Sequence, residues 1–117
     1  MDSSILTSIK KLLGITEDYE HFDQDIIMHI NGVLFVLNQL GIGASKGFII
    51  TDKSETWADF VSEDYTYKVG MLQVYVYMKV RLVFDPPQSS AAMKAMEELI
   101  KEYEWRLNIE AESNEEE

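Results

Sequence analysis

Three potential metal ligands stand four residues apart in the first third of the chain: His21, Asp25 and His29. This spacing places imidazole and carboxylate groups along one edge of a helix. Ligands spread over that length are too far apart to converge on one ion, and an adjacent pair usually needs further ligands from another segment. We therefore interpret the three residues as a solvated helix face and assign no metal site.

Other patterns of catalytic residue types are incomplete. The stretch GIGASKG, residues 41–47, lacks the spacing of a phosphate-binding loop. No G-x-S-x-G motif indicates a nucleophilic serine, and the chain has no cysteine. The neighbouring carboxylates of Glu97 and Glu98 point apart on a helix, which suits a solvated surface. The sequence therefore predicts a protein that is not an enzyme and that needs no cofactor.

Aromatic residues are numerous for a chain of 117 residues, and a small helical domain is not expected to enclose them all. Each one alone is more often part of a core than of a contact surface. Together with Arg81 and Arg106 they suit subunit interfaces, where Tyr, Trp and Arg are enriched. The residues in question are Trp57, Tyr65, Tyr67, Tyr75, Tyr77, Tyr103 and Trp105.

The elements that would position these side chains are predicted to be helices. Apolar residues at helical spacing predict a short helix that ends at Gly14 and a longer one over about 23–40 that ends at Gly41. The glycine-rich loop that follows contains Phe48-Ile49-Ile50, which is long enough for one strand or an extended loop.

A third helix of one or two turns is predicted around Trp57. Asp52 or Ser54 is its expected N-cap, because Glu55 follows Asp52 at the spacing of a capping box.

The segment 65–84 is rich in Tyr and Val and alternates imperfectly between apolar and polar residues. Its length without a turn signal exceeds the usual strand of roughly five or six residues. A helical stripe also fits, so we predict a helix that is buried on most sides.

A hard break follows at Asp85-Pro86-Pro87. Two successive prolines supply no amide donors, and the residue before a proline is pushed out of the helical region, so the helix must stop near Phe84. Ser89 or Ser90 is expected to cap a new helix. The break is therefore a rigid corner in a C-terminal helical hairpin.

Composition limits the function further. The chain carries 21 acidic and 10 basic residues, a net charge of −11, so its surface as a whole repels phosphate and anionic lipid. Binding to nucleic acid or to a membrane is therefore not expected. Glutamates gather at the C-terminal end, and the sequence predicts a disordered acidic tail over 111–117 after one domain over 1–110. The predicted fold is all-α, a compact bundle of four or five helices.

Two stretches carry a resemblance to a known family: FDQDIIMHINGVLFVLNQLGIG, residues 22–43, and YMKVRLVFDPPQSSAAMKAMEELIKEYEWRLNI, residues 77–109. They resemble the small head-tail connector proteins of long-tailed double-stranded DNA bacteriophages and prophages. Trp57-Ala58-Asp59-Phe60 falls where such proteins often have a tryptophan–phenylalanine pair. The similarity runs from about residue 3 to residue 110 and includes no catalytic signature.

The resemblance implies a structural adaptor that forms a ring, expected to be twelvefold, beneath the portal protein. Such a ring joins the DNA-filled capsid to the next adaptor or tail-completion protein, and DNA passes through it without specific binding. The resemblance also implies assembly in the host cytoplasm and a final place in the virion neck. The positions that it maps to a subunit or portal interface are Lys79, Arg81, Asp85, Pro86, Pro87, Trp105, Arg106 and Leu107.

An alternative function belongs to another class. A small acidic regulator could mimic the charge of DNA and bind a basic nucleic-acid-binding protein, and the net charge suits it equally well. Such a mimic needs carboxylates spread like phosphates, whereas many here are gathered near the C-terminal end.

Overall fold

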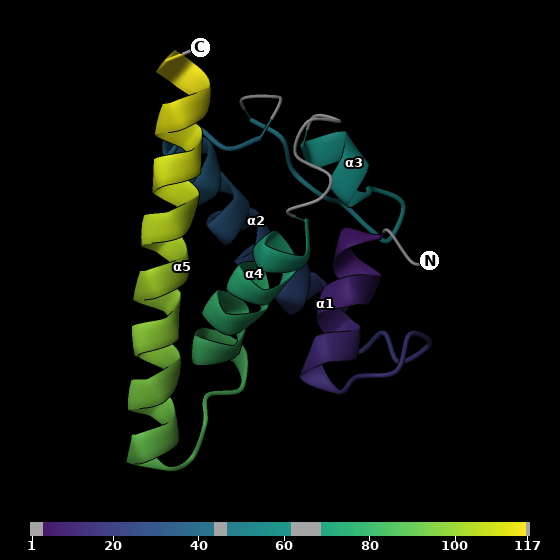
Figure 1. Cartoon of the computed structure of the whole chain (residues 1–117). Coiled ribbons are helices and arrows are strands. Elements are labelled where there is room, and N and C mark those ends of the chain that lie inside the picture. The colour runs from purple at the N-terminus through teal and green to yellow at the C-terminus, as the bar shows by residue number, and fades with distance from the viewer. Residues whose placement is uncertain (1–3, 44–46, 62–68, 117) are drawn as a thin grey trace.

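The computed structural model describes residues 4–43, 47–61 and 69–116, with side chains as far as Ile109. In this part of the chain the secondary structure is entirely helical apart from one isolated bridge between Ser4 and Thr56. The all-α prediction and the C-terminal helical hairpin are therefore confirmed (Figure 1). The helices are α1 (Ile5–Leu13), α2 (Asp23–Gln39), α3 (Trp57–Phe60), α4 (Val69–Phe84) and α5 (Ser90–Glu116).

Helix α1 begins and ends with the expected local chemistry. The Ser4 hydroxyl accepts a hydrogen bond from the Thr7 amide at 3.2 Å, which satisfies one of the free amides of the first turn. Gly14 ends the helix with a φ of 83°, a left-handed conformation that glycine adopts without steric cost. The predicted C-terminus of this helix is confirmed.

Helix α4 occupies the middle of the bundle and packs against α1, α2 and α5. Its side chains Leu72, Val76 and Val80 are fully buried, as the predicted stripe requires, whereas Val83 at the end of that stripe is 63% exposed. They meet the apolar face of α2, which contributes Ile30 and Leu37 among others. Burial of these side chains on both helices stabilises the fold by removing apolar surface from water. The four residues before α4 that were predicted to be helical lie outside the described residues.

The segment Phe48-Ile49-Ile50 is an extended loop, the second of the two predicted possibilities. It is held by a side chain rather than by a strand. The Asn31 side-chain amide donates to the Ile50 carbonyl at 3.0 Å, and its oxygen accepts from the Ile50 amide at 2.8 Å. One asparagine on α2 thus supplies the two bonds that a neighbouring strand would make.

Helix α3 begins later in the chain than either predicted N-cap. Thr56, and not Asp52 or Ser54, is the N-cap: its hydroxyl accepts from the Asp59 amide, and the Asp59 carboxylate accepts from the Thr56 amide. The Asp52 and Glu55 signal belongs to a turn instead, in which the Glu55 carboxylate accepts bonds from Thr51 and from the Asp52 amide. Two capping patterns overlap in this sequence, and only one of them starts a helix.

The hairpin between α4 and α5 follows the predicted corner. Helix α4 ends at Phe84, and the Ser89 hydroxyl accepts from the Ala92 amide at 3.1 Å to cap α5. Helix α5 is about 40 Å long at 1.5 Å per residue, which nearly equals the 42 Å longest dimension of the molecule. The hairpin therefore sets the length of the protein.

The C-terminal end differs from the predicted disordered tail, because α5 continues to Glu116. Neither glycine nor proline interrupts the chain after Ser90, and alanine and glutamate favour the helical state. A helix that the core has already nucleated extends at little further cost. The division of the chain into a domain over 1–110 and a separate tail stays a prediction.

Candidate functional site

Five of the positions that the resemblance maps to an interface lie at the corner of the hairpin or on the part of α4 that leads to it, where Lys79 is half-buried. The Asp85 amide donates to the Arg81 carbonyl at 2.9 Å, which closes the last turn of α4. The Arg81 guanidinium in turn donates to the Asp85 carbonyl at 3.2 Å and to the Tyr77 hydroxyl at 2.9 Å. Pro86 is exposed and Pro87 is half-buried. The arginine thus braces the helix end from which the prolines depart.

This corner is tied to the rest of the domain by aromatic packing. The ring of Phe84 meets that of Phe22 edge to face, with centroids 5.4 Å apart. Phe22 also contacts Tyr19 and His21 in the loop that leads into α2. Such edge-to-face pairs add specific geometry to apolar burial. The corner is therefore fixed both to its own helix and to the loop between α1 and α2.

The positions on α5 divide between the core and the surface. Leu107 is fully buried, so it supports the bundle and offers no contact surface in this fold. Trp105 is 61% exposed, and Arg106 forms a solvent-exposed ion pair with Glu102 at 3.7 Å. Trp105 lies roughly 22 Å along α5 from its first residue at 1.5 Å per residue. The corner and the Trp105 region are therefore two separate surfaces.

Most of the aromatic residues considered for an interface have roles inside the fold. Trp57 is buried and donates its indole N–H to the Ser8 hydroxyl at 3.2 Å. Tyr75 is buried, Tyr77 and Tyr103 are half-buried, and Trp105 alone among the described ones is exposed. The remaining candidates, residues 65 and 67, lie outside the described residues.

Tyr75 and Glu104 join the two arms of the hairpin. The Tyr75 hydroxyl on α4 donates to the Glu104 carboxylate on α5 at 2.8 Å. Burial, followed by this hydrogen bond and the negative charge of the carboxylate, raises the pKa of Tyr75 well above its usual value. The folded hairpin thus favours the protonated, neutral form of the Tyr75 hydroxyl.

A buried lysine was not predicted from the sequence. Lys10 on α1 is only 2% exposed, and its ammonium group contacts the carbonyls of Glu17 and Tyr19 at 3.0 and 2.8 Å. It also pairs with the Asp23 carboxylate at 2.8 Å. The sequence does contain one indication that this lysine is buried: residue 10 falls on the apolar stripe between Leu6 and Leu13. A lysine in that place needs buried acceptors.

The possible metal ligands remain separate. His21 and Asp25 are exposed and His29 is half-buried. Within the described ranges, no three histidine, cysteine or acidic side chains come together as a possible metal site. In the same part of the chain, no helix combines the length and apolar character that crossing a bilayer requires.

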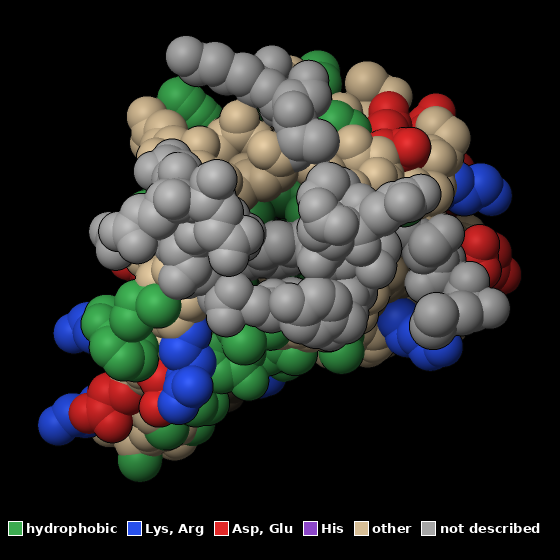
Figure 2. Space-filling model, turned by 45° about the horizontal axis from the view of Figure 1, so that its top comes forward, with side chains coloured by type: hydrophobic (Ala, Val, Ile, Leu, Met, Phe, Trp, Pro, Cys, Tyr) green, Lys and Arg blue, Asp and Glu red, His purple; other side chains and the backbone are tan. Residues whose placement is uncertain are grey.

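Large apolar side chains are exposed on several elements, among them Val83 at the end of α4 and Ile49 in the loop that follows α2. Met28 and Phe35 on α2 are 61% and 53% exposed, and Trp105 stands out on α5. Figure 2 shows hydrophobic, basic and acidic side chains side by side over the left of the surface, the side on which α5 lies in Figure 1. A helical bundle with a braced hairpin and apolar helix faces has the features of a structural protein that contacts other proteins.

Comparison with known families agrees with this class. A family model described as phage connector protein matches residues 5–114, and the chain belongs to that family. The resemblance stated from the sequence is therefore confirmed, and the protein has a structural role as a phage head-tail connector. No curated protein matches the chain, and no solved structure does.

Proposed function

We propose that this connector assembles as a ring, expected to be twelvefold, beneath the phage portal protein. The ring would join the DNA-filled capsid to the next adaptor or tail-completion protein in the virion neck, after assembly in the host cytoplasm. The observation that carries the proposal is membership of the connector family over residues 5–114.

The structure of the hairpin supports this assembly. A closed ring needs two different contact surfaces on each subunit at a constant angle, because that angle sets the number of subunits. In this chain, two prolines, the hydrogen bonds of Arg81 and the Tyr75–Glu104 hydrogen bond hold the angle between α4 and α5. We propose Lys79, Arg81, Asp85, Pro86 and Pro87 as one subunit or portal contact, and exposed Trp105 and Arg106 as part of another.

Charge supports the passage of DNA. A channel through which a genome moves should not bind it, and a protein with a net charge of −11 repels phosphate. Specific binding of DNA is therefore not part of the proposal. The same charge suits the alternative function as an acidic DNA mimic, which no contact among the described residues favours over the ring.

The test is the mass of the purified protein in solution by light scattering, alone and then with the portal protein encoded by the same phage. A ring, or binding that depends on the portal, supports the proposal. A strict monomer that ignores the portal contradicts it. In that event, titration against a panel of basic DNA-binding proteins tests the mimic.

A further inference from the structure

The side of α2 that faces away from α4 is apolar and exposed. We define the outer face of α2 as Met28, Gly32, Phe35, Val36 and Gln39, which share one side of the helix at helical spacing. No charged residue occurs from Ile26 to Gly43, in a chain of which 26% is charged. Large exposed apolar patches on a protein surface often mark sites of protein contact.

Gly32 stands in the middle of this face, and the fold itself does not require a glycine there. A Cβ added at this position would meet nothing within 4 Å. A glycine inside a helix costs about 1 kcal/mol relative to alanine. Gly32 thus lowers the stability of α2 and leaves its surface without a side chain at a point where the isolated subunit has room for one. This position leaves room for a close approach by something outside the subunit.

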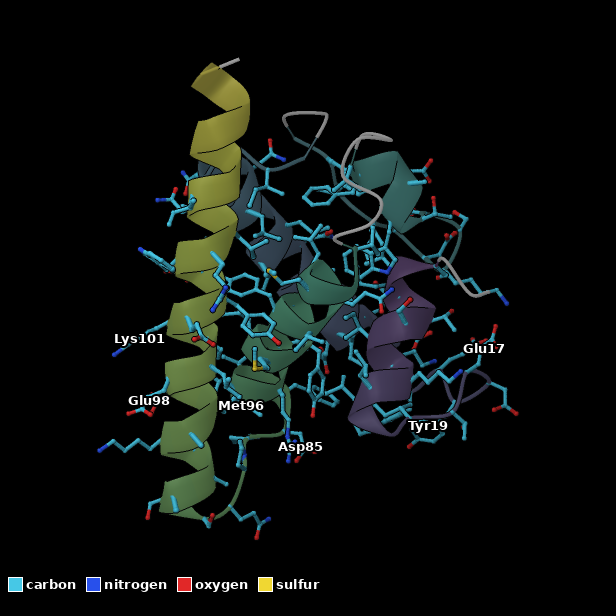
Figure 3. The ribbon with its side chains drawn as sticks, in the orientation of Figure 1. Glu17, Tyr19, Asp85, Met96, Glu98 and Lys101 are labelled. Carbon is cyan, nitrogen blue, oxygen red and sulfur yellow. The ribbon has the colours of Figure 1, made fainter. Side chains whose placement is uncertain are left out.

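A large exposed side chain that could fill the flat position is present on the same chain. Lys101 and Glu98 point away from the bundle on α5, on the side opposite to Met96, which points toward α4 (Figure 3). Trp105 is one helical turn beyond Lys101 and shares this side, as does Ile109. We define the outer face of α5 as Glu98, Lys101, Trp105 and Ile109.

Electrostatics restricts where two copies can meet. Each copy carries a net charge of −11, so an acidic surface on one repels an acidic surface on the next. The outer face of α2 has no acidic or basic side chain. On the outer face of α5, Lys101 balances Glu98, and the exposed Glu102 at the edge of this face pairs with Arg106. These two faces therefore come together without like-charge repulsion.

We propose that the outer face of α2 binds the outer face of α5 from a second copy of this chain, with the Trp105 indole packed over Gly32. This contact presupposes the ring assembly proposed above and names the residues that form it. Because the two faces belong to different helices, the contact can be made head to tail, and each subunit then binds one neighbour on either side. A reciprocal two-fold pair would use up both faces and stop at a dimer. Tryptophan is among the residues that contribute most to such interfaces.

Crosslinking tests the pairing directly, because the chain has no cysteine of its own. The double variant Gln39→Cys with Lys101→Cys is treated with a short thiol crosslinker under conditions in which light scattering shows wild-type assembly. The expected result is a ladder of covalent oligomers on a denaturing gel. The matched control pairs Lys11→Cys, exposed on α1, with Lys101→Cys, and it is expected to give no ladder.

Each other outcome overturns the contact. Met28→Cys paired with Lys101→Cys covers the other relative direction of the two helices. Assembled particles that give no ladder with either pair show that the ring exists but uses other surfaces, which leaves the proposed function intact. Dimers from Gln39→Cys alone show that α2 meets α2 of its neighbour. A wild type that assembles neither alone nor with the portal removes both the contact and the ring.

Substitutions give a second, independent test. Gly32→Leu places a good helix former where space is open, so the melting temperature of the subunit should not fall, while the side chain blocks the Trp105 contact. Phe35→Glu and Trp105→Ala should each weaken assembly by roughly tenfold or more, as expected of residues at the centre of an interface. Leu12→Glu, at a 43% exposed position on α1, is the control and should assemble as wild type does. Normal assembly of Gly32→Leu and Trp105→Ala would refute the contact.

Discussion

Replacing the buried lysine of α1 should destabilise the protein more than any other single loss of charge. Lys10→Met keeps an unbranched apolar stem but removes an ammonium group that has three acceptors at 2.8–3.0 Å. The loss leaves the Asp23 carboxylate without its cation and two carbonyls without their donor. Because these carbonyls lie in the loop between α1 and α2, the loop loses the side-chain contact that holds it against α1.

The magnitude follows from the burial of the partners. Breaking a buried ion pair by removing one partner costs roughly 3–5 kcal/mol. The Asp23 side chain is 19% exposed, so water can hydrate part of its charge and the cost falls toward the lower end. We expect a loss of about 2–4 kcal/mol, out of a total stability of about 5–15 kcal/mol for a domain.

The assay is urea denaturation followed by the helical circular dichroism signal. Lys11→Met is the matched control, because Lys11 is the next residue on α1 and is exposed. Its effect should stay within about 0.5 kcal/mol. The effect of Lys10→Met should also depend little on salt, because a buried pair is weakly screened. A Lys10→Met variant that unfolds at the same urea concentration as Lys11→Met would refute the reasoning.

Three further expectations concern the hairpin. Pro86→Ala combined with Pro87→Ala should impair ring assembly or ring angle more than folding, because the corner gains freedom while the core is unchanged; normal particle size and normal infectivity would contradict this. Deleting residues 111–117 should leave the melting temperature essentially unchanged, as for other chain ends, whereas a large drop would show that this end of α5 packs. Because the pKa of Tyr75 is raised by burial and by Glu104, its hydroxyl stays protonated in the fold while the unfolded chain ionises above about pH 10. The stabilising contribution of Tyr75 to the free energy of unfolding is therefore complete below about pH 10 and is lost as the pH rises further. Tyr75→Phe should therefore cost about 1 kcal/mol at neutral pH and flatten the loss of stability above pH 10; an unchanged alkaline slope would argue against this role.

Local chemistry made several boundaries predictable. Gly14 ends α1 because only a residue that tolerates positive φ continues the chain there. The paired prolines end α4 because they lack amide donors, and Ser89 starts α5 because its hydroxyl replaces a missing bond. Each of these effects depends on a few neighbouring residues, so sequence inspection is sufficient.

Competition between local signals was harder to resolve. Both Asp52 and Thr56 have an acidic residue three positions later, and only the second pair starts a helix. The choice depends on Trp57, whose burial beside Ser8 fixes where the helical turn must lie. Contacts with a distant segment decided between two patterns of equal local quality.

The sequence by itself determined an all-α hairpin fold and its main breaks, because helix periodicity, caps and prolines act over short distances. Membership of the connector family rests instead on the family model that matches residues 5–114. Only the tertiary structure decided which side chains are buried. It placed Lys10 inside and Trp105 outside, put Leu107 in the core, and left the uncharged face of α2 uncovered. Burial depends on which helices meet, and that is set by packing among segments far apart in the chain rather than by the composition of any one of them.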